Sequence, residues 1–301
     1  MLLPHERNDL YVSIDGKLMA ADCAAVSVWD HGFLYGDGVF EGMRVRDGLL
    51  YQAHAHMARL AASAQTLGIA LPATPVNILD SVVSLIARNM LDNCYVRVIV
   101  TRGMGAPGID PTSCTSSSCV ILTYPQPPSL GTGPLRLLTS SVVRKAPRSI
   151  GAHVKSLNYL DSILAKLQAK SASMDDAIML DDHGLVAEAT GANVFLVMRG
   201  VLHTPTTIAA LPGITRRSVM ELAGTSGLRV VERSIPPMEL YVADEVFLTG
   251  TAAGIVPVAA IDGRSLPTDR PIGDRIRQAY DADVRHPDRG LAISPDGGWS
   301  R

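Results

Sequence analysis

The chain has 301 residues and a formal net charge of −2 at pH 7, so it carries no overall basic field of the kind that nucleic-acid binding requires. Hydrophobic residues make up 47% and charged residues 19%, which is typical of a globular enzyme long enough for two domains. The apolar runs are too short to span a bilayer and the N-terminus lacks the features of a signal peptide, so we expect a cytoplasmic protein.

The first third of the sequence predicts hairpins, strands and two helices. Asp15-Gly16 and Asp47-Gly48 each separate two apolar runs, which is the strongest short signal of a β-hairpin. The elements expected after them are helices over about 54–67 and 76–91 and strands over 95–101 and 118–123.

Residues 125–134 interrupt this pattern with proline, glycine and serine and carry no charge. Such a composition predicts an interdomain linker. We therefore expect a small N-terminal α/β domain over 1–124 and a larger domain over 135–301, with an α+β fold overall.

The second half predicts two helices among further strands. A helix over about 158–172 would turn Leu160, Ile163, Leu164 and Leu167 inward, and a second helix would run from Thr215, as its cap, to about Gly224. The last 25 or so residues, with Asp288-Arg289-Gly290 and Pro295-Asp296-Gly297-Gly298, predict a loose tail. Strands are expected over 135–143, 176–180, 194–198 and 201–203 and near Val230 and Val246.

Neither the cysteines nor a histidine pair predicts a metal site. Cys114 and Cys119 lie close together in a Ser/Thr-rich segment, and reduced thiols explain them better than a redox pair or half of a metal site. His54 and His56 have no cysteine or carboxylate beside them in a metal-binding pattern. We interpret them as polar positions at the start of a helix.

Three blocks supply groups that pyridoxal 5′-phosphate (PLP) chemistry requires. Lys155 offers an amine that can hold the cofactor's aldehyde and move a proton at the substrate α-carbon. Glu188 offers an acid that favours the protonated pyridine ring. Gly213, Ile214 and Thr215 offer backbone N–H groups to a phosphate at a predicted helix start. Taken alone, Lys155 is better explained as a surface lysine at a helix start. Glu188 alone has the alternative of a solvated strand-end residue, and Gly213–Thr215 that of an ordinary capped helix.

Further candidates have two interpretations each. Tyr95 and Arg97 alternate with valines, so they share one strand face, which suits a substrate carboxylate or the solvent side of an edge strand. Thr251 lies in the small-residue turn 250–254, which is either a second phosphate-binding turn or a plain tight loop. Arg59 would face away from Met57 and Leu60 as a solvated residue.

Five blocks in a fixed order form a specific combined pattern. They are Asp30–Arg44, Val154–Leu160, Ala187–Phe195, Leu211–Thr215 and Ala243–Ala253. Together they resemble the class IV (fold type IV) PLP-dependent aminotransferases, specifically the branched-chain amino acid aminotransferase group, from about Tyr11 to Ile261. The resemblance implies a two-domain fold similar to that of D-amino acid aminotransferase, with a small α/β domain and a larger β-barrel-like α/β domain. It also implies a homodimer or a higher homo-oligomer.

The resemblance also implies roles for individual residues. Lys155 would bond to PLP and be the catalytic residue, Glu188 would pair with the pyridine nitrogen, and Tyr159 would reach the ring hydroxyl. No metal is implied. The residues implied for the phosphate are Arg59, Gly213, Ile214, Thr215 and Thr251, and those for the substrate are Tyr35 (across a dimer interface), Phe40, Tyr95, Arg97, Thr251 and Ala252.

The implied reaction is transamination between a hydrophobic, branched-chain L-amino acid and 2-oxoglutarate by a ping-pong mechanism. Phe40-Glu41-Gly42 and Tyr159 favour the branched-chain group, whereas Ala192 and the segment Val143–His153 depart from the common pattern. The alternatives are a D-amino acid or (R)-amine transaminase, a 4-amino-4-deoxychorismate lyase on the same scaffold, and a non-catalytic PLP-binding protein.

Overall fold

The computed structural model describes residues 9–125, 130, 133–294 and 298–300. Residue contacts divide the chain into two compact units. The first unit comprises Met1–Pro127, Val154–Asn158 and Val284–Arg301, and the second comprises Pro128–His153 and Tyr159–Asp283. Most of the predicted linker 125–134 lies outside the described residues. The predicted boundaries 1–124 and 135–301 differ from this division at 154–158 and 284–301, and the domains as separate folding units stay a prediction.

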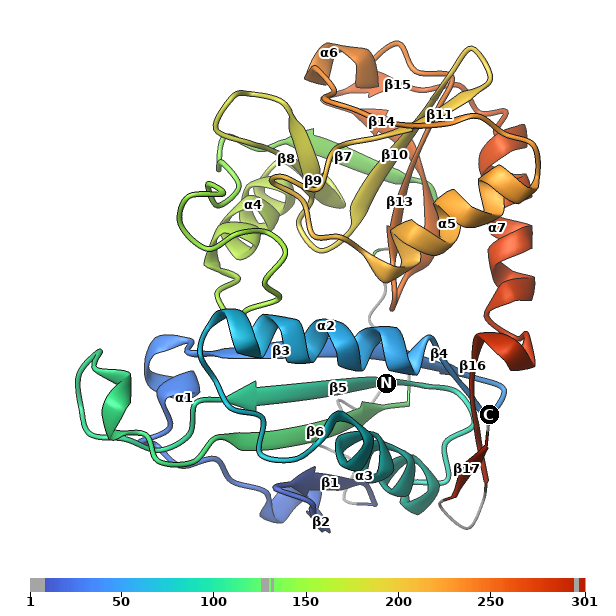
Figure 1. The fold of residues 1–301 in the computed structure, drawn as a ribbon. Helices are drawn as coiled ribbons and strands as arrows, with labels where there is room; N and C mark the ends of the chain where they lie inside the picture. Colours follow the sequence, from blue (N-terminus) through green and yellow to red (C-terminus); the bar gives the residue numbers. More distant parts are fainter. Residues whose placement is uncertain (1–8, 126–129, 131–132, 295–297, 301) are drawn as a thin grey trace. The chain divides into compact units, whose positions relative to one another are not determined.

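The first unit is built on an eight-stranded antiparallel sheet with the order β17-β16-β4-β3-β5-β6-β1-β2 (Figure 1). The helix α2 (Ala53–Thr66) packs on β3, and α3 (Pro75–Arg88) packs on β1 and β6. The short helix α1 (His31–Tyr35) precedes β3. The strands are β1 (Tyr11–Ile14), β2 (Lys17–Ala20), β3 (Gly38–Arg46), β4 (Leu49–Tyr51), β5 (Cys94–Thr101), β6 (Ser118–Tyr124), β16 (Gly290–Ile293) and β17 (Trp299–Ser300).

Both predicted hairpins are confirmed. Asp15 and Gly16 have φ of 51° and 77°, and Asp47 and Gly48 have φ of 52° and 74°. Positive φ at both central residues gives a turn whose twist matches that of the flanking strands. The Asp-Gly pairs therefore set the β1–β2 and β3–β4 connections locally.

The predicted loose tail at the C-terminus is wrong for the described residues. The helix α7 (Pro271–Asp283) buries Ile276 and Tyr280, and β16 pairs with β4. Leu291 is buried in the first unit, and a Cβ at Gly290 would lie 2.6 Å from the carbonyl oxygen of Leu50. Gly290 thus allows β16 and β4 to pack closely.

The second unit contains a nine-stranded mixed sheet with the order β12-β11-β10-β13-β14-β7-β8-β9, from which β15 branches at β14. The pairs β11–β12, β14–β7 and β7–β8 are parallel. The sheet curls, since β9 at one end of this order contacts β10, and the Ala189 N–H donates to the Ala192 carbonyl in the turn between them. The strands are β7 (Leu135–Thr139), β8 (Asp176–Leu180), β9 (Val186–Ala189), β10 (Asn193–Met198), β11 (Val201–Thr204), β12 (Val230–Glu232), β13 (Glu245–Gly250), β14 (Gly254–Ile261) and β15 (Arg264–Ser265).

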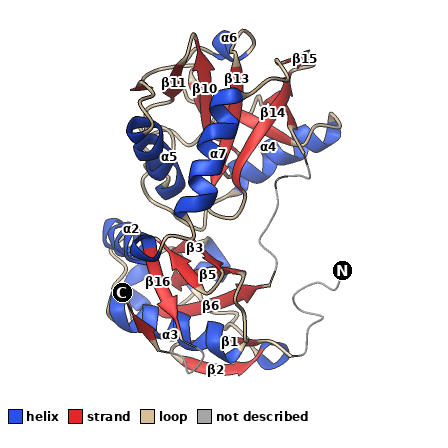
Figure 2. Ribbon diagram, turned by 90° about the vertical axis from the view of Figure 1, so that its right-hand side faces the viewer, coloured by secondary structure: helices blue, strands red, loops and turns tan. Residues whose placement is uncertain are grey.

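Helices flank this sheet, with α5 (Ile214–Thr225) and α7 packing on each other and on β13 (Figure 2). The short helix α6 (Pro237–Leu240) contributes Leu240 to the core that the sheet encloses. Among the described residues, no helix combines the length and the apolar character that a membrane span requires.

The helix α4 (Leu160–Ser171) forms as predicted but buries the opposite face. Its buried residues are Ser162, Ala165 and Ala169, and the two alanines pack against Ala177 and Met179 of β8. Small residues allow the helix to approach the sheet closely. The four large residues predicted to point inward are exposed by 73%, 51%, 52% and 56%, in the order Leu160, Ile163, Leu164 and Leu167.

Element ends differ from the prediction by a few residues. The strand β7 ends at Thr139 rather than at Val143, and α3 ends at Arg88 rather than at Leu91. The N-cap of α5 is Gly213, so Thr215 is not the cap that the sequence predicted but the second residue of the helix.

Candidate functional site

Phe40, Glu41 and Gly42 lie in the middle of β3 and point to alternate faces of the sheet. Gly42 is the register partner of Arg97 on β5, so Phe40, Gly42 and Arg97 share one face. The Arg97 guanidinium lies 4.0 Å from the centre of the Phe40 ring, and the Lys155 Nζ lies 4.5 Å from it. Phe40, Arg97 and Lys155, which the resemblance assigned to the substrate and the cofactor, thus lie together in the first unit.

Tyr95 completes this group because Gly42 leaves room for it. A Cβ at Gly42 would lie 1.8 Å from the Tyr95 hydroxyl oxygen. The strand β5 lies between β3 and β6, and Tyr95 is nearly buried, which excludes the alternative of a solvent face on an edge strand. Gly42 is therefore required by the side chain on the neighbouring strand.

The backbone of β3 positions Lys155. The Phe40 N–H donates to the Lys155 carbonyl at 2.9 Å, and the Leu157 N–H donates to the Gly38 carbonyl at 2.9 Å. The Lys155 N–H donates to the Ser63 hydroxyl of α2 at 3.2 Å. A Cβ at Gly38 would lie 2.7 Å from the Leu157 side chain, so glycine is needed for this close approach.

On the opposite face of β3, Glu41 forms a buried cluster with two residues of α2. Glu41 accepts from Arg59 Nε at 2.6 Å and Nη2 at 2.9 Å and from His56 Nδ1 at 2.7 Å. Arg59 is only 12% exposed, so the predicted solvated position is wrong. No functional role was predicted for Glu41 or His56. The spacing of His56 and Arg59, three residues apart, already placed these two on one helix face, whereas nothing local connected Glu41 with them.

Electrostatics explains which groups of this cluster are charged. Burial by itself would raise the pKa of Glu41. The charge and hydrogen bonds of Arg59, together with those of His56, outweigh this effect and lower the pKa of Glu41 to about 2. Burial lowers the pKa of His56, and Glu41 offsets this only in part. His56 is therefore neutral near pH 7 and donates through Nδ1, and its Nε2 has no hydrogen-bond partner among the described residues.

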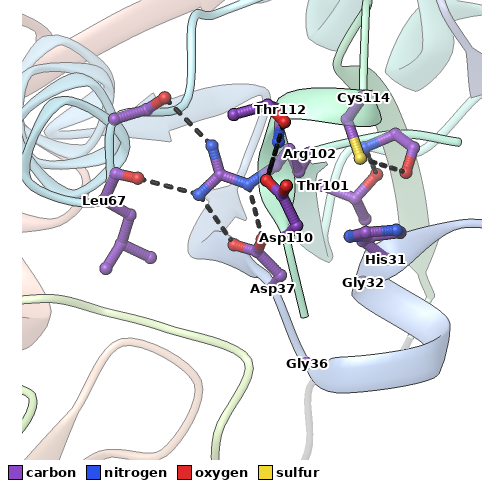
Figure 3. Close-up of polar contacts among 12 residues, drawn as sticks. His31, Gly32, Gly36, Asp37, Leu67, Thr101, Arg102, Asp110, Thr112 and Cys114 are labelled. Carbon is purple, nitrogen blue, oxygen red and sulfur yellow. Dashed lines mark hydrogen bonds and ion pairs between the residues drawn. The ribbon is translucent and has the colours of Figure 1, made fainter. Parts of the chain in front are cut away.

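Tyr35 lies on α1, in a segment that side chains of β5 and the following loop hold in place. Its hydroxyl accepts from the Gly108 N–H at 2.7 Å, and its ring meets His31 edge-on. Figure 3 shows Arg102 donating to both oxygens of Asp37 and to backbone carbonyls that include that of Leu67. The contacts of Arg102 fix the chain before β3, and the Tyr35 hydroxyl is bound by the loop that follows β5 in the same chain.

In the second unit, Glu188 is 4% exposed and is paired with Arg144, for which no functional role was predicted. Arg144 donates to one Glu188 oxygen from Nε at 2.9 Å and from Nη2 at 2.5 Å. The segment of Arg144 looked unusual in sequence, but nothing in it pointed to a residue 44 positions later.

The other Glu188 oxygen accepts from the Asn193 side chain at 3.2 Å and from the Leu211 N–H at 3.1 Å. Asn193 also donates to the Leu211 carbonyl at 2.9 Å, and a Cβ at Gly213 would lie 2.0 Å from the Asn193 amide oxygen. Glu188 is thereby connected directly to the segment that begins α5.

The start of α5 suits an anion. Ile214 and Thr215 are 5% and 3% exposed, and no side chain caps the helix at Gly213. Buried N–H groups in a first turn need hydrogen-bond acceptors. An anion can accept these bonds, and it also interacts favourably with the positive end of the helix dipole. The turn that holds Thr251 and Ala252 connects β13 to β14, and at its start a Cβ at Gly250 would lie 3.6 Å from the Gly191 carbonyl oxygen.

Tyr159 is the N-cap residue of α4, and Lys145 lies 5.7 Å from its ring centre. The predicted residues therefore form two groups, one in each unit. The first contains Tyr35, Phe40, Arg59, Tyr95, Arg97 and Lys155, and the second contains Tyr159, Glu188, Gly213, Ile214, Thr215, Thr251 and Ala252.

The cysteines and histidines are the remaining candidates from the sequence. No group of three or more histidine, cysteine or acidic side chains could hold a metal ion within the described ranges. Cys114 and Cys119 are free thiols, and burial raises the pKa of Cys119 to about 12. Neither thiol has the lowered pKa of a reactive cysteine.

Known proteins resemble this chain in sequence and in fold. The amino-transferase class IV family matches residues 38–261. A putative branched-chain-amino-acid aminotransferase of Methanocaldococcus jannaschii is 46% identical over 254 residues, which cover 84% of this chain and 88% of the relative. The branched-chain aminotransferase of Thermoproteus uzoniensis, solved with norvaline, superposes with a TM-score of 0.87 at 34% identity and covers 91% of this chain and 94% of its own.

A third match was solved with the cofactor. The branched-chain amino acid aminotransferase of Thermobaculum terrenum, in its PLP-form, superposes with a TM-score of 0.83 at 29% identity, covering 92% of this chain and 94% of that one. The family match spans most of the chain, and the structural matches confirm the predicted fold. The chain therefore belongs to the class IV aminotransferases, within their branched-chain amino acid aminotransferase group.

Proposed function

We propose that the chain transfers amino groups between hydrophobic, branched-chain L-amino acids and 2-oxoglutarate, with PLP as its cofactor. The observation that carries the proposal is the position of Lys155, whose ammonium group lies 4.5 Å from the centre of the Phe40 ring. The names of the relatives support the substrate class, and the PLP-form of the Thermobaculum terrenum enzyme supports the cofactor.

The residues present fit PLP. Bound PLP supplies an aldehyde for an amine and a ring that withdraws electrons from the substrate α-carbon. Lys155 is the amine for that aldehyde and moves the α-proton in both halves of a ping-pong reaction. The buried Glu188 carboxylate suits a protonated ring nitrogen, and Tyr159 suits the ring hydroxyl.

The phosphate would be held chiefly at the start of α5. Ile214 and Thr215 lie in its buried, uncapped first turn, and Gly213 precedes them. Thr251 adds a hydroxyl, and Arg59, fixed by Glu41, adds a guanidinium.

The proposed substrate residues of the first unit support a specificity for both kinds of substrate. Phe40 offers an apolar surface for a branched side chain, and Tyr95 and Arg97 offer polar partners for a carboxylate. A dicarboxylate such as 2-oxoglutarate needs one more cationic partner than a branched-chain substrate, and Arg97 is suited to this role. Ala252 and Tyr35 complete the proposed substrate residues.

The apolar face of α4 supports a homodimer or a higher homo-oligomer. Ile163, Leu164 and Leu167 are more than half exposed, and a hollow of about 630 Å³ beside them is lined by Leu138 and Val142. Large exposed apolar patches mark interaction surfaces. We also propose a cytoplasmic location, with which the free thiols are consistent.

The test uses the visible absorption band of the PLP-loaded protein. L-leucine should remove the band and 2-oxoglutarate should restore it, whereas Lys155→Ala should bind PLP without turnover. Loss of the band with D-alanine or an (R)-amine alone would overturn the L-amino acid assignment. Release of pyruvate from an amino-substituted chorismate derivative without an added keto acid would indicate the lyase instead.

A further inference from the structure

Arg144 is a buried cation that the reaction as described does not use. It is 9% exposed, and its backbone N–H donates to the Leu180 carbonyl at 2.8 Å, which fixes the irregular segment after β7 against β8. Its guanidinium contacts two carboxylates that come from different elements of the second unit. One is Glu188 of β9, and the other is Asp161 of α4.

The geometry of the guanidinium divides its donors between these partners. Nε and Nη2 both donate to a single Glu188 oxygen, at 2.9 Å and 2.5 Å. Nη1 donates to Asp161 at 2.9 Å and to the Ser162 hydroxyl at 3.3 Å. Only arginine offers donors in a rigid planar fork of this kind, so lysine could not make the same set of bonds.

Arg144 is charged in this position. Burial works against its charge, but Glu188 and Asp161 outweigh burial and raise the pKa of Arg144 above its ordinary value. A buried ion pair contributes little stability compared with apolar residues of the same volume. The arrangement is therefore better explained by what the pair does to Glu188 than by its contribution to folding.

Arg144 and the Asn193–Leu211 pair together fix both oxygens of Glu188. One oxygen accepts from Arg144, and the other accepts from the Asn193 side chain at 3.2 Å and the Leu211 N–H at 3.1 Å. With donors on each side, the carboxylate cannot rotate without breaking a charged hydrogen bond. A nearby guanidinium also favours the charged form of a carboxylate.

We propose that Arg144 is a positioning residue for the cofactor, which holds the Glu188 carboxylate in the orientation that pairs with the pyridine nitrogen of PLP. The proposal rests on the proposed function, because it needs PLP to bind with its ring nitrogen at Glu188. Arg144 acts through Glu188 and touches neither the substrate nor the reacting atoms. Asp161 and Ser162 fix the other side of the guanidinium, so α4 sets its direction.

The first experiment titrates the apo-protein with PLP and follows the absorption band of the bound cofactor. Arg144→Met should raise the PLP dissociation constant roughly tenfold to a hundredfold, the range expected when a charged hydrogen-bond partner is lost. Arg277→Met is the matched control, because Arg277 lies on α7 with an exposed partner in Asp274 and should bind PLP as the wild type does.

The second experiment asks whether Arg144 acts through Glu188. In a double-mutant cycle with Glu188→Gln, Arg144→Met should change the PLP dissociation constant by less than about threefold, because the carboxylate that it orients is gone. Independent, additive effects of the two substitutions would overturn the proposal. In steady-state kinetics, kcat should fall in Arg144→Met while the KM for the amino acid stays within about twofold.

The outcomes separate this proposal from the proposed function. A wild-type protein that takes up no PLP would refute the function itself. A wild type that binds PLP, beside an Arg144→Met variant with the same affinity and band, would refute only the role of Arg144. If Arg144→Met fails to fold, Arg144→Lys replaces it in the test, because lysine keeps the charge but lacks the planar fork of donors. Reduced PLP affinity of Arg144→Lys would support the proposal, and wild-type affinity and spectrum would overturn it.

Discussion

Three consecutive residues of β3 each make a different contact. Phe40 lies beside Lys155 and Arg97, Glu41 anchors Arg59 and His56 on the opposite face, and Gly42 leaves space for Tyr95. The alternation of a strand makes this possible, because adjacent residues serve opposite faces of one sheet. The Phe-Glu-Gly sequence is thus explained by contacts, with Glu41 acting on Arg59 rather than on the substrate group.

Gly42→Ala should displace Tyr95, because the new Cβ would lie 1.8 Å from its hydroxyl oxygen. We expect overpacking to lower the free energy of unfolding by about 1–3 kcal/mol. We also expect kcat/KM for the amino acid to fall more in this variant than in a control variant. Urea unfolding and steady-state kinetics measure the two effects. Gly133→Ala is the control, because a Cβ there meets nothing within 4 Å. Wild-type kinetics in Gly42→Ala would contradict a role for Tyr95 in substrate binding.

Glu41 should make stability depend on pH in the acid range. Its pKa is about 2 in the folded protein and 4.5 ordinarily, so its contribution is fully present above pH 4.5 and is lost as pH falls towards 2. A shift of this size corresponds to about 3 kcal/mol. Glu41→Gln should therefore destabilise the protein most at neutral pH, and the difference from wild type in denaturant unfolding should shrink below pH 4.5. A difference that is constant with pH would show that the carboxylate charge is not what stabilises the cluster.

At the scale of elements, α4 shows that an amphipathic pattern does not tell which side faces the protein. Its alanine face packs on β8, and its leucine face is exposed. The periodicity of the large apolar residues is that of a buried stripe. The exposed stripe is explained if a second copy of the chain covers it in the proposed homo-oligomer.

Leu164→Glu should therefore weaken self-association, because Leu164 lies in the middle of the exposed stripe and beside the hollow. Sedimentation at several protein concentrations measures the assembly. Met238→Glu on α6 is the control, since Met238 is also an exposed apolar residue, at 68%. Equal assembly of wild type and both variants would exclude α4 from the contact between subunits.

At the scale of the whole molecule, the chain crosses between its two units more than once. Residues 154–158 and 284–301 belong to the first unit although most of the sequence around them belongs to the second. They supply backbone partners to β3 and β4, through Lys155 to Phe40 and through Gly290 to Tyr51. The first unit is therefore incomplete when only its N-terminal part is present.

A polypeptide that ends at Pro127 should not unfold cooperatively. It lacks the segments that pair with β3 and β4, so backbone groups of these two strands are left without their partners. Circular dichroism during denaturation tests this against the full chain. A cooperative transition of the shortened polypeptide would show instead that residues 1–127 fold independently, close to the predicted domain boundary at 124.

The sequence by itself determined the local geometry and the family. Asp15-Gly16 and Asp47-Gly48 set their hairpins because their backbone conformations are local, and most helices and strands followed from periodicity. The five sequence blocks identified the class IV aminotransferases because they are short, ordered segments that the family match confirms.

Only the tertiary structure decided which groups meet. Arg144 and Glu188 are 44 residues apart, and Glu41 and Arg59 are 18 apart on different elements, so no local pattern predicts either pair. The same holds for the exposed face of α4 and for β16, which pairs with β4 across most of the chain. Burial and charge pairing depend on distant partners, and these become neighbours only when the sheets and helices have packed.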